Sequence, residues 1–128
     1  MRRYSKRDKV SDLLRHAISN ALLTELEDER LKWLSVTEVR LSGDLAHGRV
    51  FYSILPGTSS REEAEEALEE NMGSLRRYLG RNLRLKRLPA LTFTYDETLD
   101  RAERIESLLR TAKEGGDDGS PPDSDDAG

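Results

Sequence analysis

The chain has 128 residues, no cysteine and a formal net charge of −4. This length suits one domain that can bury most of its apolar surface without covalent cross-links. Without cysteine the protein has no disulfide, no zinc–thiolate site and no cysteine nucleophile, which fits the reducing cytoplasm. No apolar run of signal-peptide length follows the basic start, and no segment approaches the ~20 apolar residues of a membrane span. We therefore expect a cytoplasmic protein without a membrane partner.

The negative charge is concentrated at the C-terminal end of the chain. Residues 114–128 hold six of the 25 acidic residues and neither Lys nor Arg, so residues 1–113 carry 19 acidic against 21 basic residues. The body of the protein is therefore slightly positive. Glycine, proline and serine fill much of the remaining C-terminal sequence, which has almost nothing apolar to bury. We predict one folded domain over residues 1–113 and a disordered acidic tail over residues 114–128.

Local patterns predict a helix followed by a β-hairpin in the first half of the chain. Residues 5–8 form a candidate capping box, and apolar residues then recur at helical spacing over residues 10–22. Two segments of alternating apolar and polar residues follow at 34–41 and 49–54. The turn signal Ser-Gly-Asp at 42–44 lies between these segments and predicts that they pair as a hairpin.

The second half of the chain predicts a long helix, a strand and a last helix. A second capping box at residues 60–63 opens an apolar stripe that continues to residue 83. Because Gly73 and Gly80 interrupt it, we expect a kinked pair of helices and not one straight helix. Residues 91–95 alternate as a third strand, and Asp96 is a candidate N-cap for the last helix. The order predicts an α+β fold in which a three-stranded sheet carries helices on one face.

Between residues 76 and 89 the sequence is basic and contains no acidic residue. Helical spacing predicts that Arg77, Arg81 and Arg84 lie on the side opposite the apolar stripe. A row of guanidinium groups without carboxylates suits a polyanion. The alternative is a solvated helix end that complements the helix dipole, but the basic run continues into the following loop. The candidate RNA-binding residues are Arg76, Arg77, Arg81, Arg84, Lys86 and Arg87, together with Lys6 and Arg7 at the start of the first helix.

The residues that carry enzyme chemistry are missing from recognisable arrangements. His16 and His47 are isolated in sequence and have no neighbouring nucleophile and acid. The glutamates over residues 62–70 are typical of a solvated helix face. Neither a phosphate-binding loop nor a dinucleotide fingerprint is present. We therefore expect no catalytic activity, no metal, no cofactor and no small-molecule substrate.

Two blocks of sequence carry a family resemblance. Residues 34–55 read LSVTEVRLSGDLAHGRVFYSIL. Residues 83–98 combine the basic loop, the segment PALTF and an acid-capped helix start at Asp96. Over roughly residues 5–110 the chain resembles ribosome-binding factor A, an assembly factor of the small ribosomal subunit.

The resemblance implies a single KH-like domain in which a kink of Ala-x-Gly form replaces the usual GxxG clamp. That position here reads Asn71-Met72-Gly73, which keeps the glycine and replaces the alanine. We expect Asn71 to brace the kink through a local hydrogen bond and not to read a base. The resemblance also implies a monomer that binds the immature small subunit and its precursor rRNA. There it would assist late rRNA processing without catalysing a reaction.

Two other classes of function remain open from the residues alone. The same fold could serve as a protein-interaction or dimerisation module whose basic run is only solvated. A small hydrolase would need a nucleophile that the sequence does not reveal. Steep salt dependence would separate RNA binding from protein docking, because neutralised phosphates release counterions.

Overall fold

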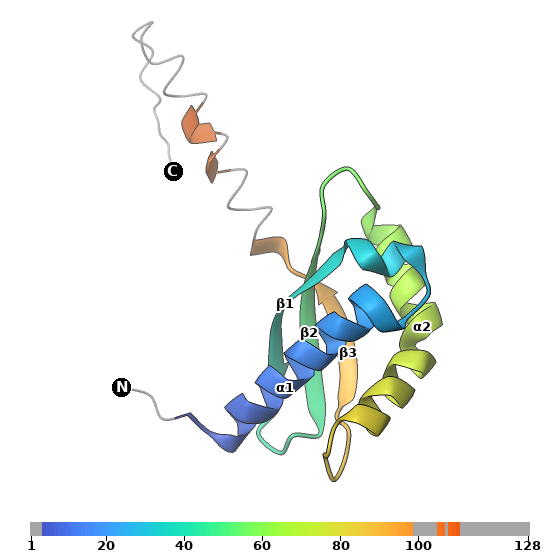
Figure 1. The fold of residues 1–128 in the computed structure, drawn as a ribbon. Helices are drawn as coiled ribbons and strands as arrows, with labels where there is room; N and C mark the ends of the chain where they lie inside the picture. Colours follow the sequence, from blue (N-terminus) through green and yellow to red (C-terminus); the bar gives the residue numbers. More distant parts are fainter. Residues whose placement is uncertain (1–3, 99–104, 107, 111–128) are drawn as a thin grey trace, which may run out of the picture. The chain divides into compact units, whose positions relative to one another are not determined.

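A computed structural model describes residues 4–98, 105–106 and 108–110 of the chain (Figure 1). The chain divides into two units, Met1–Asp96 and Glu97–Gly128. The elements of the first unit are α1 (Lys6–Asn20), the π-helical η1 (Ala21–Glu25), the 3₁₀ helix η2 (Glu29–Trp33), β1 (Leu34–Leu41), β2 (His47–Ile54), α2 (Arg61–Asn82) and β3 (Ala90–Tyr95). In the second unit the described residues are helical. The rest of the predicted last helix and the predicted acidic tail lie outside the described residues.

Both predicted capping boxes are present and begin the two main helices. Ser5 Oγ accepts a hydrogen bond from the Asp8 N–H at 3.1 Å, and the Asp8 carboxylate accepts from the Ser5 N–H at 2.9 Å. Ser60 and Glu63 form the same reciprocal pair at 3.1 and 3.0 Å. Each box satisfies two backbone N–H groups that a helix start leaves unpaired. The helices therefore begin where the local sequence predicted.

The three strands form one sheet in the order β1-β2-β3. β1 runs antiparallel to β2, as the predicted hairpin requires, and β2 runs parallel to β3 after the crossover through α2. A bulge interrupts the β1–β2 register between Val36 and Glu38. Gly48 is closely packed in the sheet: a Cβ there would lie 3.0 Å from a methyl of Leu41 and 3.1 Å from one of Leu91, so these leucine side chains would have to shift.

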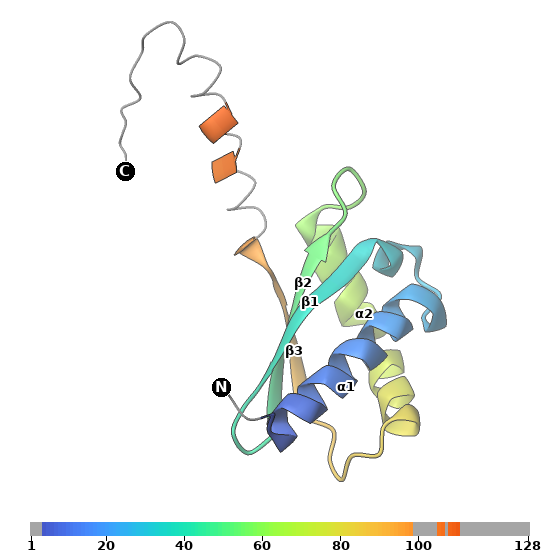
Figure 2. The same ribbon diagram turned by 60° about the vertical axis from the view of Figure 1, so that its left-hand side comes forward.

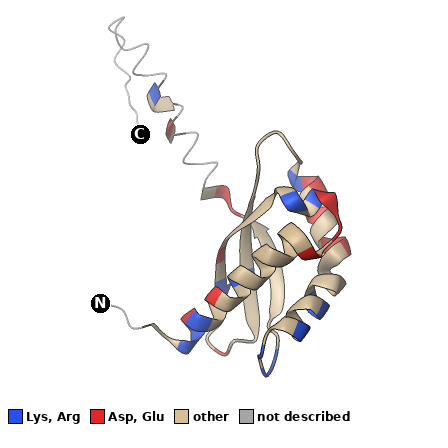
Figure 3. Cartoon of the chain, viewed as in Figure 1, with Lys and Arg blue, Asp and Glu red and all other residues tan. Residues whose placement is uncertain are grey.

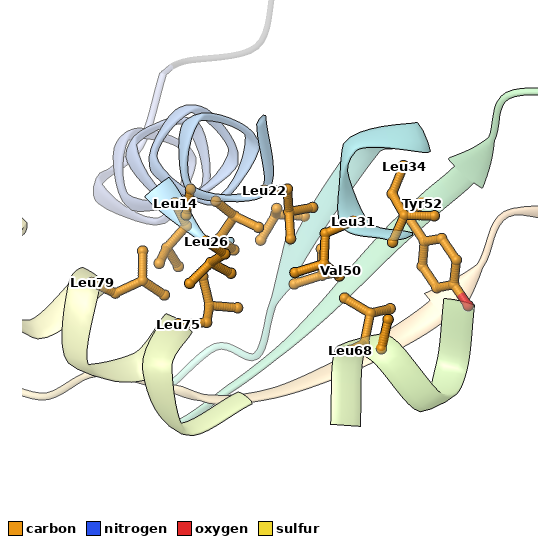
Figure 4. Close-up of a cluster of buried hydrophobic side chains, with 14 of the residues drawn as sticks. Leu14, Leu22, Leu26, Leu31, Leu34, Val50, Tyr52, Leu68, Leu75 and Leu79 are labelled. Atoms are coloured by element: carbon orange, nitrogen blue, oxygen red, sulfur yellow. The ribbon is translucent and has the colours of Figure 1, made fainter. Parts of the chain in front are cut away.

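The helices α1 and α2 cover one face of this sheet, as Figures 1 and 2 show. Buried leucines from both helices meet Val50 and Tyr52 of the central strand (Figure 4). The Tyr52 ring also meets Phe93 and Tyr95 of β3, with centroid separations of 6.4 and 5.9 Å. Burial of each large apolar side chain contributes about 1.5–3 kcal/mol to the free energy of folding. This single core therefore stabilises the packing of both helices on all three strands.

α2 is one continuous helix of 22 residues, and it does not split into the kinked pair that the two glycines suggested. Figure 1 shows it as a single ribbon that bends without breaking. Leu68 and Leu75, on either side of Gly73, are both buried. Burial of each leucine contributes more than the ~1 kcal/mol that a glycine costs inside a helix. The buried stripe therefore keeps α2 helical through both glycines.

Candidate nucleic-acid interface

The helix ends before the basic stretch does. α2 stops at Asn82, so Arg84 and the basic residues after it lie in the loop to β3. The prediction that Arg84 continues the helical row of arginines is therefore wrong. Leu83 and Leu85 both pack against the core, and residues two apart cannot face the same side of a helix. Their burial favours an extended loop over a further helical turn.

Arg76 connects the end of α2 to the start of β3. Its Nη1 donates to the carbonyl oxygen of Pro89 at 3.0 Å, and the side chain is half-buried. A guanidinium that satisfies a backbone carbonyl in this way holds both ends of the basic loop. Arg76 thus differs from the other candidate residues, because it positions the loop and its cation is not freely exposed.

Arg77 and Arg81 are exposed one helical turn apart on the last part of α2. Residues at this spacing share one side of a helix, so the predicted row is retained for these two. The Arg77 guanidinium donates to Ser74 Oγ at 3.3 Å. Neither arginine forms an ion pair with another described residue. Their charges are therefore available to an external anion.

A groove brings the start of α1 together with the basic loop and the hairpin turn between β1 and β2. Its lining residues are Lys6, Val10, Asp44, Leu45, Arg84, Leu85, Lys86, Arg87 and Pro89. We call this the basic groove. Lys6 is more than 75 residues from the loop in sequence, yet it shares the groove with the loop cations. Arg7 is exposed on α1 but does not line the groove. Figure 3 shows the cations of α1, the last turns of α2 and the loop at one end of the domain.

One carboxylate lines the basic groove and was not predicted as part of the site. Asp44 Oδ1 accepts hydrogen bonds from Ser42 Oγ at 2.7 Å and from the Ala46 N–H at 3.0 Å. These bonds hold the pKa of Asp44 below its usual value, so it is ionised at neutral pH. The next residue, Leu45, has a φ of 62°, a strained conformation for leucine. The sequence signal was the Ser-Gly-Asp turn, which marks a turn but not its place beside the loop.

The side chain of Asn71 is held from two directions. Its Nδ2 donates to the Ala67 carbonyl at 2.8 Å and to Asp28 Oδ2 at 2.9 Å. The first is a local hydrogen bond within the continuous α2 and not the brace of a kink, and the second joins α2 to the segment before η2. Met72 packs against the core, while Gly73 is exposed. That Asn71 does not read a base stays a prediction.

Asp28 is itself held by an arginine that sequence reasoning missed. Arg30 donates to both carboxylate oxygens of Asp28, at 2.9 and 2.5 Å, and to Glu70 at 2.7 Å. The Arg30 guanidinium is the main reason why the pKa of Asp28 lies far below its usual range, and the Asn71 amide adds to the effect. No local sequence pattern could indicate the hydrogen bond between Asn71 and Asp28, because 43 residues separate them.

Comparison with known proteins identifies the family. The profile of the family described as ribosome-binding factor A matches residues 6–109. The chain belongs to the ribosome-binding factor A family. Ribosome-binding factor A of Halothermothrix orenii is 36% identical over 106 residues, which cover 83% of this chain and 87% of the relative. The protein of the same name from Renibacterium salmoninarum is 34% identical over 106 residues, 83% of this chain and 73% of the relative.

A solved structure of ribosome-binding factor A has the same fold. The crystal structure from Thermus thermophilus matches with a TM-score of 0.62 and 31% identity over 70% of this chain and 93% of that chain. The predicted family and the KH-like α+β fold are thus confirmed. Among the described residues, no helix has the length and apolar character needed to cross a membrane. The same part of the chain holds no cluster of three or more potential metal ligands.

Proposed function

We propose that this protein binds the small ribosomal subunit through rRNA and assists late maturation of that rRNA, as a cytoplasmic monomer without catalytic activity. The observation that carries the proposal is the gathering of exposed cations at one end of the domain. They come from three separate elements, namely α1, the last turns of α2 and the loop to β3. Residues 1–113 would form the binding domain.

A related protein supports the choice of partner. A homology model of ribosome-binding factor A of Thermus thermophilus has been fitted into a cryo-EM map of its complex with the 30S subunit. That structure matches this chain with 31% identity and a TM-score of 0.56, over 67% of this chain and 90% of the other. The family relation and the basic end point to the same class of partner.

The geometry favours the RNA backbone as the ligand of the basic groove. Arg84, Lys86 and Arg87 are exposed on a loop whose position is held by Arg76 and by inward-facing leucines. Cations that are already ordered lose less entropy on binding a phosphate than cations on a mobile segment. Contacts of this kind position a protein on RNA through its phosphates. We expect the groove to orient the domain on the subunit.

The proposal is tested by removing two cations from this end. In the double variant Arg81→Gln/Arg84→Gln, small-subunit binding should weaken. The slope of log affinity against log salt should fall by roughly one unit per lost phosphate contact. The melting temperature should change little, since exposed charges contribute little to stability. Binding is measured by sedimentation with precursor and mature subunits over a range of salt concentrations.

The matched control is Arg15→Gln/Lys32→Gln, which removes the same charge from positions outside the basic groove. This control should retain both affinity and salt slope. Equal losses in the two double variants would mean that only the net charge matters. An unchanged salt slope in Arg81→Gln/Arg84→Gln would show that the basic end is not the RNA interface.

A further inference from the structure

The face of the sheet turned away from α1 and α2 carries a second set of cations. Along β2, Val50 and Tyr52 are buried toward the helices, so the residues between and beside them lie on the other face. Arg49 is exposed there, and Phe51 is half-buried. Figure 2 shows that neither helix covers this face. Within the first unit, it is therefore accessible to a partner.

Two arginines are direct neighbours on this open face. Arg40 of β1 and Arg49 of β2 are cross-strand partners, and Thr92 of β3 is the partner of Arg49 on the other side. Like charges directly opposite each other destabilise a sheet. A bound anion between them would remove this repulsion, and Thr92 adds a hydroxyl donor in the same row.

The two arginines differ in how their charges are compensated. The Arg40 guanidinium donates to both oxygens of Glu38, at 2.7 and 3.3 Å, and lies 5.0 Å from the centre of the Phe51 ring. Arg49 donates to the neutral hydroxyl of Thr94, at 3.0 Å. Among the described residues no carboxylate pairs with Arg49. The centre of the open face thus holds one uncompensated guanidinium.

These side chains border a second groove, whose hydrogen-bond donors suit RNA. Arg40, Ser42, His47, Arg49, Phe51 and Thr92 contribute to its lining. Guanidinium and hydroxyl groups donate to phosphate oxygens, and a base can stack on an aromatic ring or a guanidinium plane. The hairpin turn separates this groove from the basic groove, because Ser42 and His47 line the one while Asp44 and Leu45 line the other.

We propose that the open face of the sheet is a second RNA-binding surface, which holds a single-stranded segment with a phosphate at Arg49 and Thr92 and a base against Phe51. The proposal rests on the proposed function in that the natural ligand is rRNA. Its chemistry can be tested on the free protein. A single RNA strand that runs along the surface around the β1–β2 hairpin turn would occupy both grooves.

The test measures binding of a fluorescein-labelled oligouridylate of about 12 nucleotides to the full chain by anisotropy, at several salt concentrations. This length lies within the usual site sizes of single-strand binders. Arg49→Gln should lower the salt slope by about 0.7, the value for one phosphate of a single strand. If wild type and variant bind equally at 1 M salt, this change in slope makes the variant about eightfold weaker than wild type at 0.05 M salt. Arg49→Lys keeps the charge and should retain the slope.

Lys32→Gln is the matched control and should leave the slope unchanged. Combining Arg49→Gln with Arg81→Gln/Arg84→Gln should give additive reductions, because the two surfaces are separate. If Arg81→Gln/Arg84→Gln lowers the salt slope and Arg49→Gln does not, the second surface is refuted while the proposed function stands. If neither variant lowers the salt slope, both the second surface and the proposed function are refuted. An Arg49→Gln protein that binds RNA more tightly would mean that acidic residues of the chain itself cover this face, which also overturns the proposal. Melting curves verify that each variant folds.

Discussion

Asn71 stands where the family resemblance implies alanine, and its side chain joins two parts of the fold. One amide hydrogen is donated to the Ala67 carbonyl within α2, and the other to the Asp28 carboxylate. Because an asparagine amide has only two N–H groups, no donor remains for a nucleic-acid base. The substitution is therefore accounted for by packing between α2 and the segment before η2.

Replacing Asn71 tests this assignment. Asn71→Ala should lower the free energy of unfolding by about 1–3 kcal/mol, because a hydrogen bond to a charged, half-buried carboxylate is lost. Small-subunit binding should be retained, since the variant returns to the alanine that the family pattern implies. Stability is measured by urea denaturation and binding by sedimentation with the subunit.

Asn82→Ala is the control for this variant. The Asn82 amide also donates to a carbonyl four residues earlier in α2, that of Tyr78, at 2.8 Å, but it is exposed. Its replacement should change the unfolding free energy much less. An Asn71→Ala protein with unchanged stability and no subunit binding would contradict the structural role and indicate direct contact with rRNA.

At the scale of whole elements, the bend in α2 can be separated from its stability. Gly73 is exposed, and an added Cβ there would meet nothing within 4 Å. Gly73→Ala should therefore raise the free energy of unfolding by up to about 1 kcal/mol through helix propensity. If α2 bends at Gly73, a straighter helix would present Arg77 and Arg81 in another direction, so we expect subunit binding to weaken while folding stays intact.

Gly80→Ala provides the comparison for Gly73→Ala. Gly80 is equally open around its Cβ but lies only two residues from the end of α2. Its replacement should stabilise the helix without redirecting the rest of it. Equal binding by wild type and Gly73→Ala, with the expected gain in stability, would show that the bend has no part in docking.

Local sequence signals predicted the elements well because the interactions behind them are local. The capping boxes at Ser5 and Ser60 link residues three apart, and strand alternation reflects one buried face. The end of α2 was placed too late because the sequence pattern was extended through Leu83. The inward turn of Leu85 and the Arg76–Pro89 bond, which involve contacts outside the helix, decide that boundary.

The candidate site was predicted less completely because it depends on contacts between distant segments of the chain. The exposed cations Arg77 and Arg81 follow from helical spacing. The neighbourhood of Lys6 and the loop, and the link between Asp28 and Asn71, depend on how distant segments pack. A single sequence contains no periodic signal for such contacts. Basic composition thus indicated the ligand class, while the groove itself required the fold.

At the scale of the molecule, the two ends of α2 carry opposite charge. Glutamates dominate its first half, where Glu66 and Glu70 pair with Arg30, and its cations other than Arg61 lie in the second half (Figure 3). Glu70 and Arg77 are seven residues apart in this helix, about 10 Å along its axis, which is close to the Debye length of about 8 Å at physiological salt. Salt therefore screens only part of the repulsion between the acidic half and a phosphate bound at the basic end, and this repulsion should grow at low salt.

Residues 114–128 hold six further acidic residues, and the effect of these residues on RNA binding can be measured. Ending the chain after Lys113 removes six carboxylates and changes the formal charge from −4 to +2. We expect the melting temperature to stay constant, because the described core lies within the first unit. RNA affinity should rise at low salt, since carboxylates tethered to the domain compete with phosphates for its cations. The gain should vanish near 1 M salt, where the Debye length is about 3 Å.

A full-length variant separates charge from chain length in this experiment. Replacing the same six acids with Asn or Gln keeps all 128 residues and should reproduce the gain of the truncation at low salt. If truncation tightens binding and this variant does not, the effect comes from bulk and not from charge. Identical affinities of wild type, truncated chain and neutralised chain at low ionic strength would leave solubility as the function of the acidic residues. Competition between these carboxylates and rRNA would then be refuted.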